Sequence, residues 1–522
     1  MKAFLMYKDR DFDLPRRLAP NERARTQGLE LNSLIEIIPL SIVRNEQALT
    51  QDLELNTLFN AMALGDKFLF EVVKKAVLSG LNDLETIRYR QNILKDCLKN
   101  PSIVRDIYQI TIESIENKKR QWLGLFSSYP SGILGNSIEM LQMFVGLLKK
   151  LKNIADEHAD KFESEGFTAF FAMIKKELDD EYFAIVENHL RELKFRYGVL
   201  ISAELGQGNE GTSYVLRKPP DKQNWMKRLF APHAPMYSFS IHPRDDGGAR
   251  ALGELKDRGI NLVANALAQS ADHIDSFFNM LRIELAFYIG CLNLYEQLAQ
   301  MGEPVSYPLP VAPNERRLSF DGLYDVCLAL TMKQKVVGND VMADNKDLVT
   351  ITGANQGGKS TFLRSIGLAQ LMMQCGMFVP AENFCANLCE GLFTHYKRKE
   401  DASMKSGKLD EELSRMSTIA DDITSNSMAL FNESFAATNE REGSEIARQI
   451  VSALLEKRIK VFFVTHQYEF AHGFYDRKME NAIFLRAERQ ADGARTFKLI
   501  EGEPLQTSYG EDLYKGIFGT DN

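Results

Sequence analysis

The chain contains 522 residues, of which 44% are hydrophobic and 26% are charged. This length exceeds what one hydrophobic core organises, so we expect several domains. The composition excludes intrinsically disordered, collagen-like and small disulfide-stapled proteins. A formal net charge of −8 argues against a surface that attracts nucleic acid everywhere, so any DNA contact needs a local basic strip.

Membrane and redox signals narrow the protein class further. No apolar run approaches the roughly 18 residues that a membrane span needs, and the N-terminus lacks the apolar core of a signal peptide. The six cysteines form no CxxC pair, and Cys385 and Cys389 lack nearby zinc-type partners. We therefore expect a cytoplasmic protein with reduced, buried thiols and no membrane partner.

The first half of the chain divides where the spacing of apolar residues changes. Residues 1–50 are mixed and indicate an irregular N-terminal arm. Over residues 51–195 apolar side chains recur every three or four positions, which predicts a helical core and a first lever. The clearest stripe in this region comprises Leu141, Phe144, Leu148, Leu151 and Ala155.

A small β element follows at residues 196–255. Val199–Ala203 and Thr212–Leu216 predict two short strands. The segment between them, residues 206–211, matches G-x-G-x-x-G by letter, but β-favouring residues follow where a dinucleotide site needs a helix. We therefore predict a simple hairpin loop within a clamp-like segment.

Residues 256–320 predict a second long helix. Apolar side chains keep helical spacing from Val263 to Tyr295, which corresponds to roughly 48 Å of helix. One globular core rarely needs such a rod. Two long helical stretches that flank a β element therefore indicate a lever with its tip held away from the body, and an ordinary all-helical domain is the alternative.

In residues 321–522 short apolar strands alternate with helices. Leu348–Ile351, Met428–Phe431 and Val461–Val464 are the clearest strands. Such alternation predicts βαβ units around a largely parallel sheet, and hence an α/β domain.

The first of these strands runs into a phosphate-binding motif. Residues 353–360 fit G-x-x-x-x-G-K-[ST], and a helix follows, as the motif requires. Gly353, Gly357 and Gly358 let backbone N–H groups turn toward phosphate oxygens at the positive end of that helix. Lys359 would reach the terminal phosphates, and the Ser360 hydroxyl would ligate Mg²⁺.

Two further strand ends add polar side chains to this predicted nucleotide site. Asn432 and Glu433 stand where P-loop ATPases usually carry an Asp for Mg²⁺ and a Glu that aligns or deprotonates water. Asn432 keeps an oxygen but loses the charge, so we expect weaker Mg²⁺ binding. His466 ends the third strand, where its imidazole would sense the γ-phosphate. We assign catalytic roles to Lys359, Glu433 and His466.

Together these motifs resemble the ATPase domain of the MutS family of DNA mismatch-repair proteins. The family's T-G-x-N-x-G-G-K-S-T matches residues 352–361, and Asn355 and Thr361 are part of the match. Its D-E-x-x-x-x-T-x-x-x-x-G stretch lies over residues 432–443, with Asn in place of Asp. Its T-H pair lies over residues 465–466.

Weaker matches extend the resemblance to about residues 50–520. Residues 336–339, among them Val336, Val337 and Asn339, stand where the family packs residues on the adenine. Ser508–Gly510 is similar to its closing helical segment. Residues 52–55 and 81–91 resemble its helical core. Only the last 200 residues or so carry specific motifs.

The resemblance implies a fold and a set of ligands. The fold is an α-helical core and lever domain with a clamp-like β-containing insert, followed by an α/β P-loop NTPase domain of the ABC type. The ligands are ATP, Mg²⁺ and duplex or branched DNA, held by a homodimer joined through its ATPase domains. Fifty residues before the core cannot hold the family's mismatch-binding and connector domains, so we expect DNA processing without direct mismatch reading.

Candidate DNA contacts lie in the clamp-like segment. Lys222, Lys227, Arg228 and Arg244 are the basic candidates, and aromatic residues such as Tyr237 stand among them. Cations would neutralise phosphates, and aromatic rings would stack on exposed bases. Acidic residues interrupt the run, so a solvated surface insert is the alternative.

Three functions are compatible with these patterns. The first is a MutS-like ATPase in which a composite dimeric site gates a grip on DNA. The second is a nucleotide-switched interaction protein with negligible hydrolysis, which Asn432 favours. The third is a chromosome-maintenance ATPase with shortened rods. Such an ATPase would carry an S-G-G-Q-like signature, and this sequence lacks one.

Overall fold

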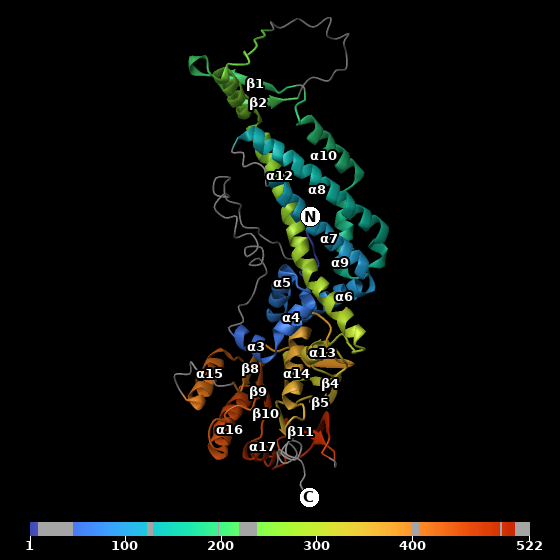
Figure 1. The fold of residues 1–522 in the computed structure, drawn as a ribbon, viewed down its shortest axis with the longest axis vertical. Helices are drawn as coiled ribbons and strands as arrows, with labels where there is room; N and C mark the ends of the chain where they lie inside the picture. The colour runs from blue at the N-terminus through green and yellow to red at the C-terminus, as the bar shows by residue number, and fades with distance from the viewer. Residues whose placement is uncertain are drawn as a thin grey trace, which may run out of the picture.

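The computed structural model places a helical body between a small β hairpin and an α/β domain (Figure 1). It describes residues 1–8, 45–122, 129–196, 198–218, 237–398, 407–490 and 493–506. The predicted N-terminal arm lies largely outside this set. Of its described residues, Ala3, Leu5 and Met6 are buried in the helical body, so this short segment belongs to the core rather than to an irregular arm.

The helical body consists of amphipathic helices, several of which start at side-chain caps. Asp66, Asp83, Ser164 and Asp179 each accept hydrogen bonds from backbone N–H groups in the first turn, which satisfies donors that have no partner within the helix. The predicted stripe between residues 141 and 155 is buried. The helices are α3 (Glu46–Asp52), α4 (Leu55–Ala63), α5 (Lys67–Leu78), α6 (Leu84–Lys99), α7 (Pro101–Trp122), α8 (Pro130–His158), η1 (Ala159–Lys161), α9 (Glu165–Glu177) and α10 (Asp180–Glu192).

One helix, α12 (Asp246–Gln300), runs from the hairpin to the α/β domain (Figure 1). Its 55 residues span roughly 80 Å. The helix begins at residue 246 rather than near 256, because the Asp245 carboxylate caps it by accepting from the Gly248 N–H at 2.8 Å. Its first turns contain glycines and charged residues, so they carry no apolar stripe that the sequence could reveal.

The hairpin at the far end of α12 consists of β1 (Leu200–Leu205) and β2 (Gly211–Arg217), which pair antiparallel. The Gly206 N–H donates to the Glu210 carbonyl at 2.8 Å and closes the loop, which includes η2 (Gln207–Asn209). A strand rather than a helix follows the glycines, so the predicted hairpin loop is confirmed. An added Cβ at Gly259 would lie 2.3 Å from the Ile201 side chain, so the hairpin packs closely on α12.

Two helices in the described part of the chain are long and apolar enough to cross a membrane by length and composition alone, although the sequence indicated no such run. They are α8, continued to residue 161, and α12, each with an 18-residue window of mean hydropathy 1.2. Within the protein, 44% of the first window and 83% of the second are buried. Because the two helices pack against each other, these apolar windows are used for helix packing.

The α/β domain is organised around a six-stranded sheet in the order β12-β11-β6-β10-β9-β8. The strands from β11 to β8 are parallel, and β12 is antiparallel to β11. The predicted parallel sheet is therefore confirmed. Its central strands β6 and β10 are buried along their whole length and mostly apolar, as expected for strands covered on both faces. The strands are β6 (Leu348–Gly353), β8 (Leu392–Tyr396), β9 (Met428–Asn432), β10 (Lys460–Val464), β11 (Ala482–Arg489) and β12 (Arg495–Glu501).

A second, four-stranded sheet in the order β3-β7-β4-β5 completes the domain. Its first strands begin before residue 321, so the α/β domain starts earlier than the sequence indicated. The strands are β3 (Leu309–Val311), β4 (Leu318–Leu323), β5 (Asn339–Met342) and β7 (Asn383–Asn387), and η3 (Pro313–Glu315) lies between β3 and β4. The helices are α13 (Val326–Met332), α14 (Lys359–Gln374), α15 (Lys408–Asp422), α16 (Glu440–Glu456) and α17 (Tyr468–Tyr475).

Candidate functional site

The glycine-rich loop lies between a central strand and a helix. Strand β6 ends at Gly353, and α14 begins directly after Gly358. These two glycines have φ angles of +106° and +85°, which residues with side chains rarely adopt. A Cβ on Gly357 would lie 2.6 Å from the Ala487 side chain. The glycines therefore allow a tight turn against β11.

The Lys359 side chain is folded into this loop. Its Nζ donates to the carbonyl oxygens of Gly353 and Ala354 at 3.0 and 2.9 Å, and the side chain is buried. Burial lowers the pKa of Lys359 to about 8, although the Glu433 carboxylate opposes the shift. An ammonium carries three N–H groups, so the third can donate to an anion that enters the loop.

The three residues predicted to hold a metal lie at one edge of the loop. Ser360 Oγ donates to Asn432 Oδ1 at 2.9 Å, which joins the start of α14 to the end of β9. Glu433 follows Asn432 in the chain and lines the same cavity as Ser360. This group offers a hydroxyl, an amide oxygen and a single carboxylate.

Glu433 is oriented by its backbone and by His466. The residue has a φ angle of +54°, and its N–H donates to the Val464 carbonyl at 2.9 Å. His466 Nε2 lies 3.1 Å from Glu433 Oε1. This hydrogen bond holds the pKa of Glu433 below its usual value. The carboxylate is therefore ionised near neutral pH and faces the imidazole.

These residues surround a cavity of about 530 Å³. Gly353 and Asn432 are not among the residues that line the cavity. Each is hydrogen-bonded to a residue that does, Gly353 to Lys359 and Asn432 to Ser360. The predicted residues that line the cavity are Val336, Val337, Asn355, Gly357, Gly358, Lys359, Ser360, Thr361, Glu433 and His466. Asn339, which belongs to the stretch expected to pack on the adenine, lines it too. The lining residues that sequence reasoning missed include Asp325, Leu328, Met332 and Phe497; they lie at the start of α13, within it and in β12, and belong to no local motif.

The Val336–Val337 segment is anchored to the end of the long helix. Glu303 lies three residues beyond α12, and its Oε1 accepts from the Val336 N–H at 2.7 Å. Burial raises the pKa of the Glu303 carboxyl. One wall of the cavity is thus held by a residue at the end of α12.

A buried histidine fixes the turn that follows Glu433. His395 Nδ1 lies 2.8 Å from Ser434 Oγ, and its Nε2 lies 3.0 Å from the Glu412 carbonyl oxygen on α15. Burial lowers the pKa of His395 to about 4, so the ring is neutral at pH 7. Sequence reasoning missed this residue, because its partners lie 17 and 39 positions away.

One of the four candidate DNA contacts lies among the described residues. Lys222, Lys227 and Arg228 lie outside the described residues, and Arg244 is exposed near the start of α12. In residues 198–218 and 237–258, six Lys or Arg side chains stand beside six Asp or Glu side chains, so the described hairpin region is not basic. It does expose aromatic rings, because Tyr237 and Phe239 are 91% and 83% accessible.

Comparisons with known proteins agree with this architecture. A family model described as the MutS2 N-terminal domain matches residues 82–301, which lie in the helical body, the hairpin and α12. A second, described as MutS domain V, matches residues 349–516, which include the glycine-rich loop.

Individual relatives match in part of their length. The DNA mismatch repair protein MutS of Thermotoga maritima is 30% identical over 235 residues, which are 45% of this chain and 29% of that protein. The MutS of Thermus aquaticus is 29% identical over 230 residues, or 44% of this chain and 28% of that protein. The matched region therefore spans less than a third of these curated relatives.

The protein combines a helical body and a hairpin-tipped long helix with an α/β domain that the domain V model matches. The MutS2 N-terminal model matches the first of these parts and the domain V model the second, in chain order. The chain belongs to the MutS family.

Proposed function

We propose that the chain is an ATPase of MutS type whose nucleotide state controls a grip on DNA. The proposal rests on one observation: Lys359, Ser360, Glu433 and His466, from three different strand ends, line a single cavity. Phosphates would lie over the glycine-rich loop, and the ammonium of Lys359 would donate to them. Glu433 would orient the attacking water, while His466 would hold Glu433 and face the γ-phosphate.

The base and ribose would occupy the opposite end of the cavity. Val336 and Val337 line the cavity together with apolar side chains of α13. An adenine ring would be packed against this apolar wall, and the Glu303 hydrogen bond to Val336 would keep the wall in place. ATP is therefore the proposed substrate.

The residues present fit Mg²⁺, although with less charge than usual. The Ser360 hydroxyl and the Asn432 oxygen are hard oxygen donors 2.9 Å apart, of the kind that Mg²⁺ accepts. When bound, the ion would neutralise charge on the phosphates. Because Asn432 is neutral, we propose that Mg²⁺ is held more weakly than by an Asp–Ser pair.

DNA binding and dimerisation are proposed on the family relationship and on the position of the hairpin. The hairpin lies at the opposite end of α12 from the α/β domain (Figure 1), whose residues line the cavity. Arg244 would contact phosphate, and the exposed Tyr237 and Phe239 rings would stack on bases. We propose duplex or branched DNA as the ligand and a homodimer joined through the α/β domains. The relatives are DNA mismatch repair proteins by name, so the proposed pathway is mismatch repair or related DNA processing.

Turnover by a Glu433→Gln variant tests the ATPase proposal. The substitution keeps the size of the side chain but removes its charge, so hydrolysis is expected to fall by about 10²-fold or more while ATP binding survives. A Glu442→Gln variant is the control, because that exposed residue lies on α16 outside the described lining. Equal turnover in all three proteins would contradict the assigned role.

The second candidate is a nucleotide-switched interaction protein, which Asn432 favours. The same turnover assay separates the two. An ATP-binding wild type whose turnover is negligible would support the switch.

A binding panel of matched, mispaired, forked and junction DNA, run with and without ATP, tests the DNA proposal. Retention with a steep salt dependence is expected. Since contacts to phosphate carry no information about the base pairs, a single mispair within a closed duplex should add no affinity. Absence of binding to every DNA at low salt would contradict it.

A further inference from the structure

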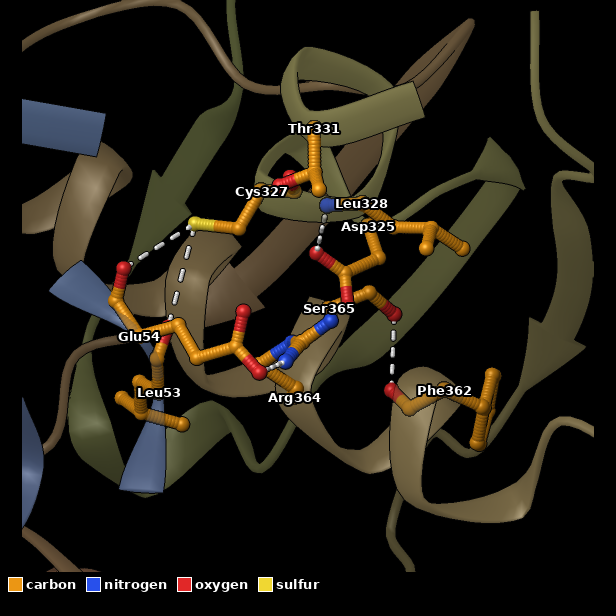
Figure 2. Close-up of polar contacts among 9 residues, drawn as sticks. All are labelled: Leu53, Glu54, Asp325, Cys327, Leu328, Thr331, Phe362, Arg364 and Ser365. Atoms are coloured by element: carbon orange, nitrogen blue, oxygen red, sulfur yellow. Dashed lines mark hydrogen bonds and ion pairs between the residues drawn. The ribbon is translucent and has the colours of Figure 1, made fainter. Parts of the chain in front are cut away.

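A largely buried arginine on the phosphate-loop helix lies between the cavity and the helical body. Arg364 is five residues after Lys359 on α14, which places it about 7.5 Å further along the helix axis. Figure 2 shows its guanidinium between the carboxylates of Asp325 and Glu54. The Arg364 side chain is only 13% exposed. One side chain thus contacts two segments that are far apart in sequence.

The contact with Asp325 joins the two walls of the cavity. Arg364 Nε lies 2.5 Å from Asp325 Oδ2, and the Asp325 side chain is fully buried. Its other oxygen, Oδ1, accepts from the Leu328 N–H at 3.0 Å and so caps α13 (Figure 2). Asp325 and Leu328 both line the cavity. Arg364 therefore links α14, which follows the phosphate loop, to α13, which also lines the cavity.

The contact with Glu54 connects the α/β domain to the helical body. Glu54 stands between α3 and α4 with a φ angle of +53°, and it forms an ion pair with Arg364 Nη1. The neighbouring Leu53 packs on α14, because a Cβ on Gly367 would lie 2.9 Å from its side chain. The α3–α4 junction is therefore seated directly on the phosphate-loop helix.

From this junction the contacts continue to the long helix. Helix α4 ends at Ala63, and two side chains of α12 hold its last turn. Asn293 Nδ2 donates to the Met62 carbonyl at 2.8 Å, and Gln297 Nε2 donates to the Ala61 carbonyl at 2.8 Å. Helix α4 is thus hydrogen-bonded to the same helix that carries the hairpin at its other end.

We propose that Arg364 is a positioning residue that transmits the nucleotide state of the cavity through Glu54 to α4 and the long helix. The inference rests on the proposed ATP site. A phosphate that pulls on Lys359 would shift α14, and Arg364 would carry this shift to α13 and to the α3–α4 junction. Because arginine presents a planar fork of donors, it can hold two carboxylates in fixed directions. The contact with Asp325 connects Arg364 to the lining of the cavity, and the contact with Glu54 connects it to the helical body.

Two substitutions test the contacts of Arg364 with Glu54 and with Asp325 separately. Glu54→Gln removes the charge that faces Arg364 but leaves the Arg364–Asp325 pair and all lining residues intact. ATP affinity should therefore stay within twofold of wild type. Asp325→Asn disturbs the cavity itself and should weaken ATP binding. Glu46→Gln is the matched control, because Glu46 on α3 is similarly exposed but pairs with Lys74 on α5 at 2.8 Å instead of with a residue of α14.

Hydrogen exchange of the full chain, measured by mass spectrometry with and without ATP and Mg²⁺, gives the readout. In the wild type, nucleotide should slow exchange both in the loop peptide around 353–366 and in the α3–α4 peptide around 46–63. In Glu54→Gln the loop protection should remain, while the α3–α4 protection should fall by about two- to fivefold, as expected for an ion pair with one half-exposed partner. Glu46→Gln should behave as the wild type.

The outcomes distinguish this inference from the proposed function. Absence of loop protection in the wild type would overturn the ATP site and with it the inference. Loop protection together with undiminished α3–α4 protection in Glu54→Gln would overturn the inference alone. If Glu54→Gln only lowers the melting temperature, as a merely structural role predicts, its nucleotide-dependent exchange will match the wild type. Arg364→Lys, which keeps the charge but loses the fork, should show the same partial loss as Glu54→Gln, and full protection there would also contradict the assigned role.

Discussion

The buried lysine of the glycine-rich loop predicts a specific pH dependence of nucleotide affinity. In the free protein the pKa of Lys359 is about 8, lowered from 10.5 mainly by burial. Glu433 and Arg495 are the charged groups that act on it. Glu433 stays ionised between pH 7 and 9, because its pKa is held below its usual value. A bound phosphate would favour the charged ammonium and raise its pKa again. Binding should therefore take up a proton above pH 8.

The sign and magnitude follow from this difference. Below pH 7 the lysine is charged in both states and contributes no pH dependence. At pH 9, one unit above its pKa, only about a tenth of the free protein carries the charge, so affinity should be about tenfold weaker than at pH 7. This corresponds to ~1.4 kcal/mol. Each further pH unit should cost another factor of about ten until the pKa of the bound state is reached.

Calorimetric titration with ATP and Mg²⁺ between pH 7 and 9 measures this effect. Repeating the titration in buffers of different ionisation enthalpy reports the proton uptake directly. Lys359→Arg is the control, because a guanidinium stays charged across this range. Equal wild-type affinity at pH 7 and pH 9 would refute the reasoning about Lys359.

Three further predictions concern residues around the loop. Asn432→Asp places a carboxylate beside Ser360, so half-maximal turnover should need less Mg²⁺, and an unchanged Mg²⁺ titration would remove Asn432 from the metal site. Gly443→Ala puts a Cβ 2.3 Å from the Phe435 carbonyl oxygen; this clash should outweigh the helix propensity gained and lower the unfolding free energy by about 1–2 kcal/mol in urea, whereas a more stable variant would contradict the packing. The buried His395 has a pKa of about 4, against 6.5 in the unfolded chain. Its contribution to the unfolding free energy is therefore complete above pH 6.5 and is lost as pH falls toward 4, by roughly 3 kcal/mol. His395→Gln should flatten the dependence of the unfolding free energy on pH in this range, and an equal slope in the wild type and the variant would contradict the reasoning.

Local patterns in the sequence predicted those parts of the fold that depend on local physics. The stripe from Leu141 to Ala155 is buried because helical spacing alone places these side chains on one face. The hairpin at residues 200–217 forms where β-favouring residues flank a glycine-containing loop. Strand, glycine-rich loop and helix follow one another around Gly353 because each needs only its neighbours in sequence. The resemblance to a family added Val336 and Val337, which do line the cavity.

The remaining site residues depend on contacts between distant segments. Phe497 reaches the cavity only because β12 returns beside β11. His395 and Arg364 act through partners on other elements, so no spacing rule indicates them. No apolar stripe indicates the start of α12, because its first turns contain glycines and charged residues. The N-terminal segment is held by a residue far along the chain, because the Glu284 carboxylate accepts from the N–H groups of Leu5 and Met6. Such information exists only once the chain is folded.

The most direct test of the account is the stoichiometric binding of ATP and Mg²⁺ to the full chain at pH 7, measured for the wild type and for Lys359→Met. The account predicts saturable binding of one nucleotide per chain by the wild type. It also predicts at least about tenfold weaker binding by a variant that remains folded, because a charge-assisted hydrogen bond to phosphate is lost. A folded wild type that binds no nucleotide, or equal affinity in both proteins, would contradict the central claim.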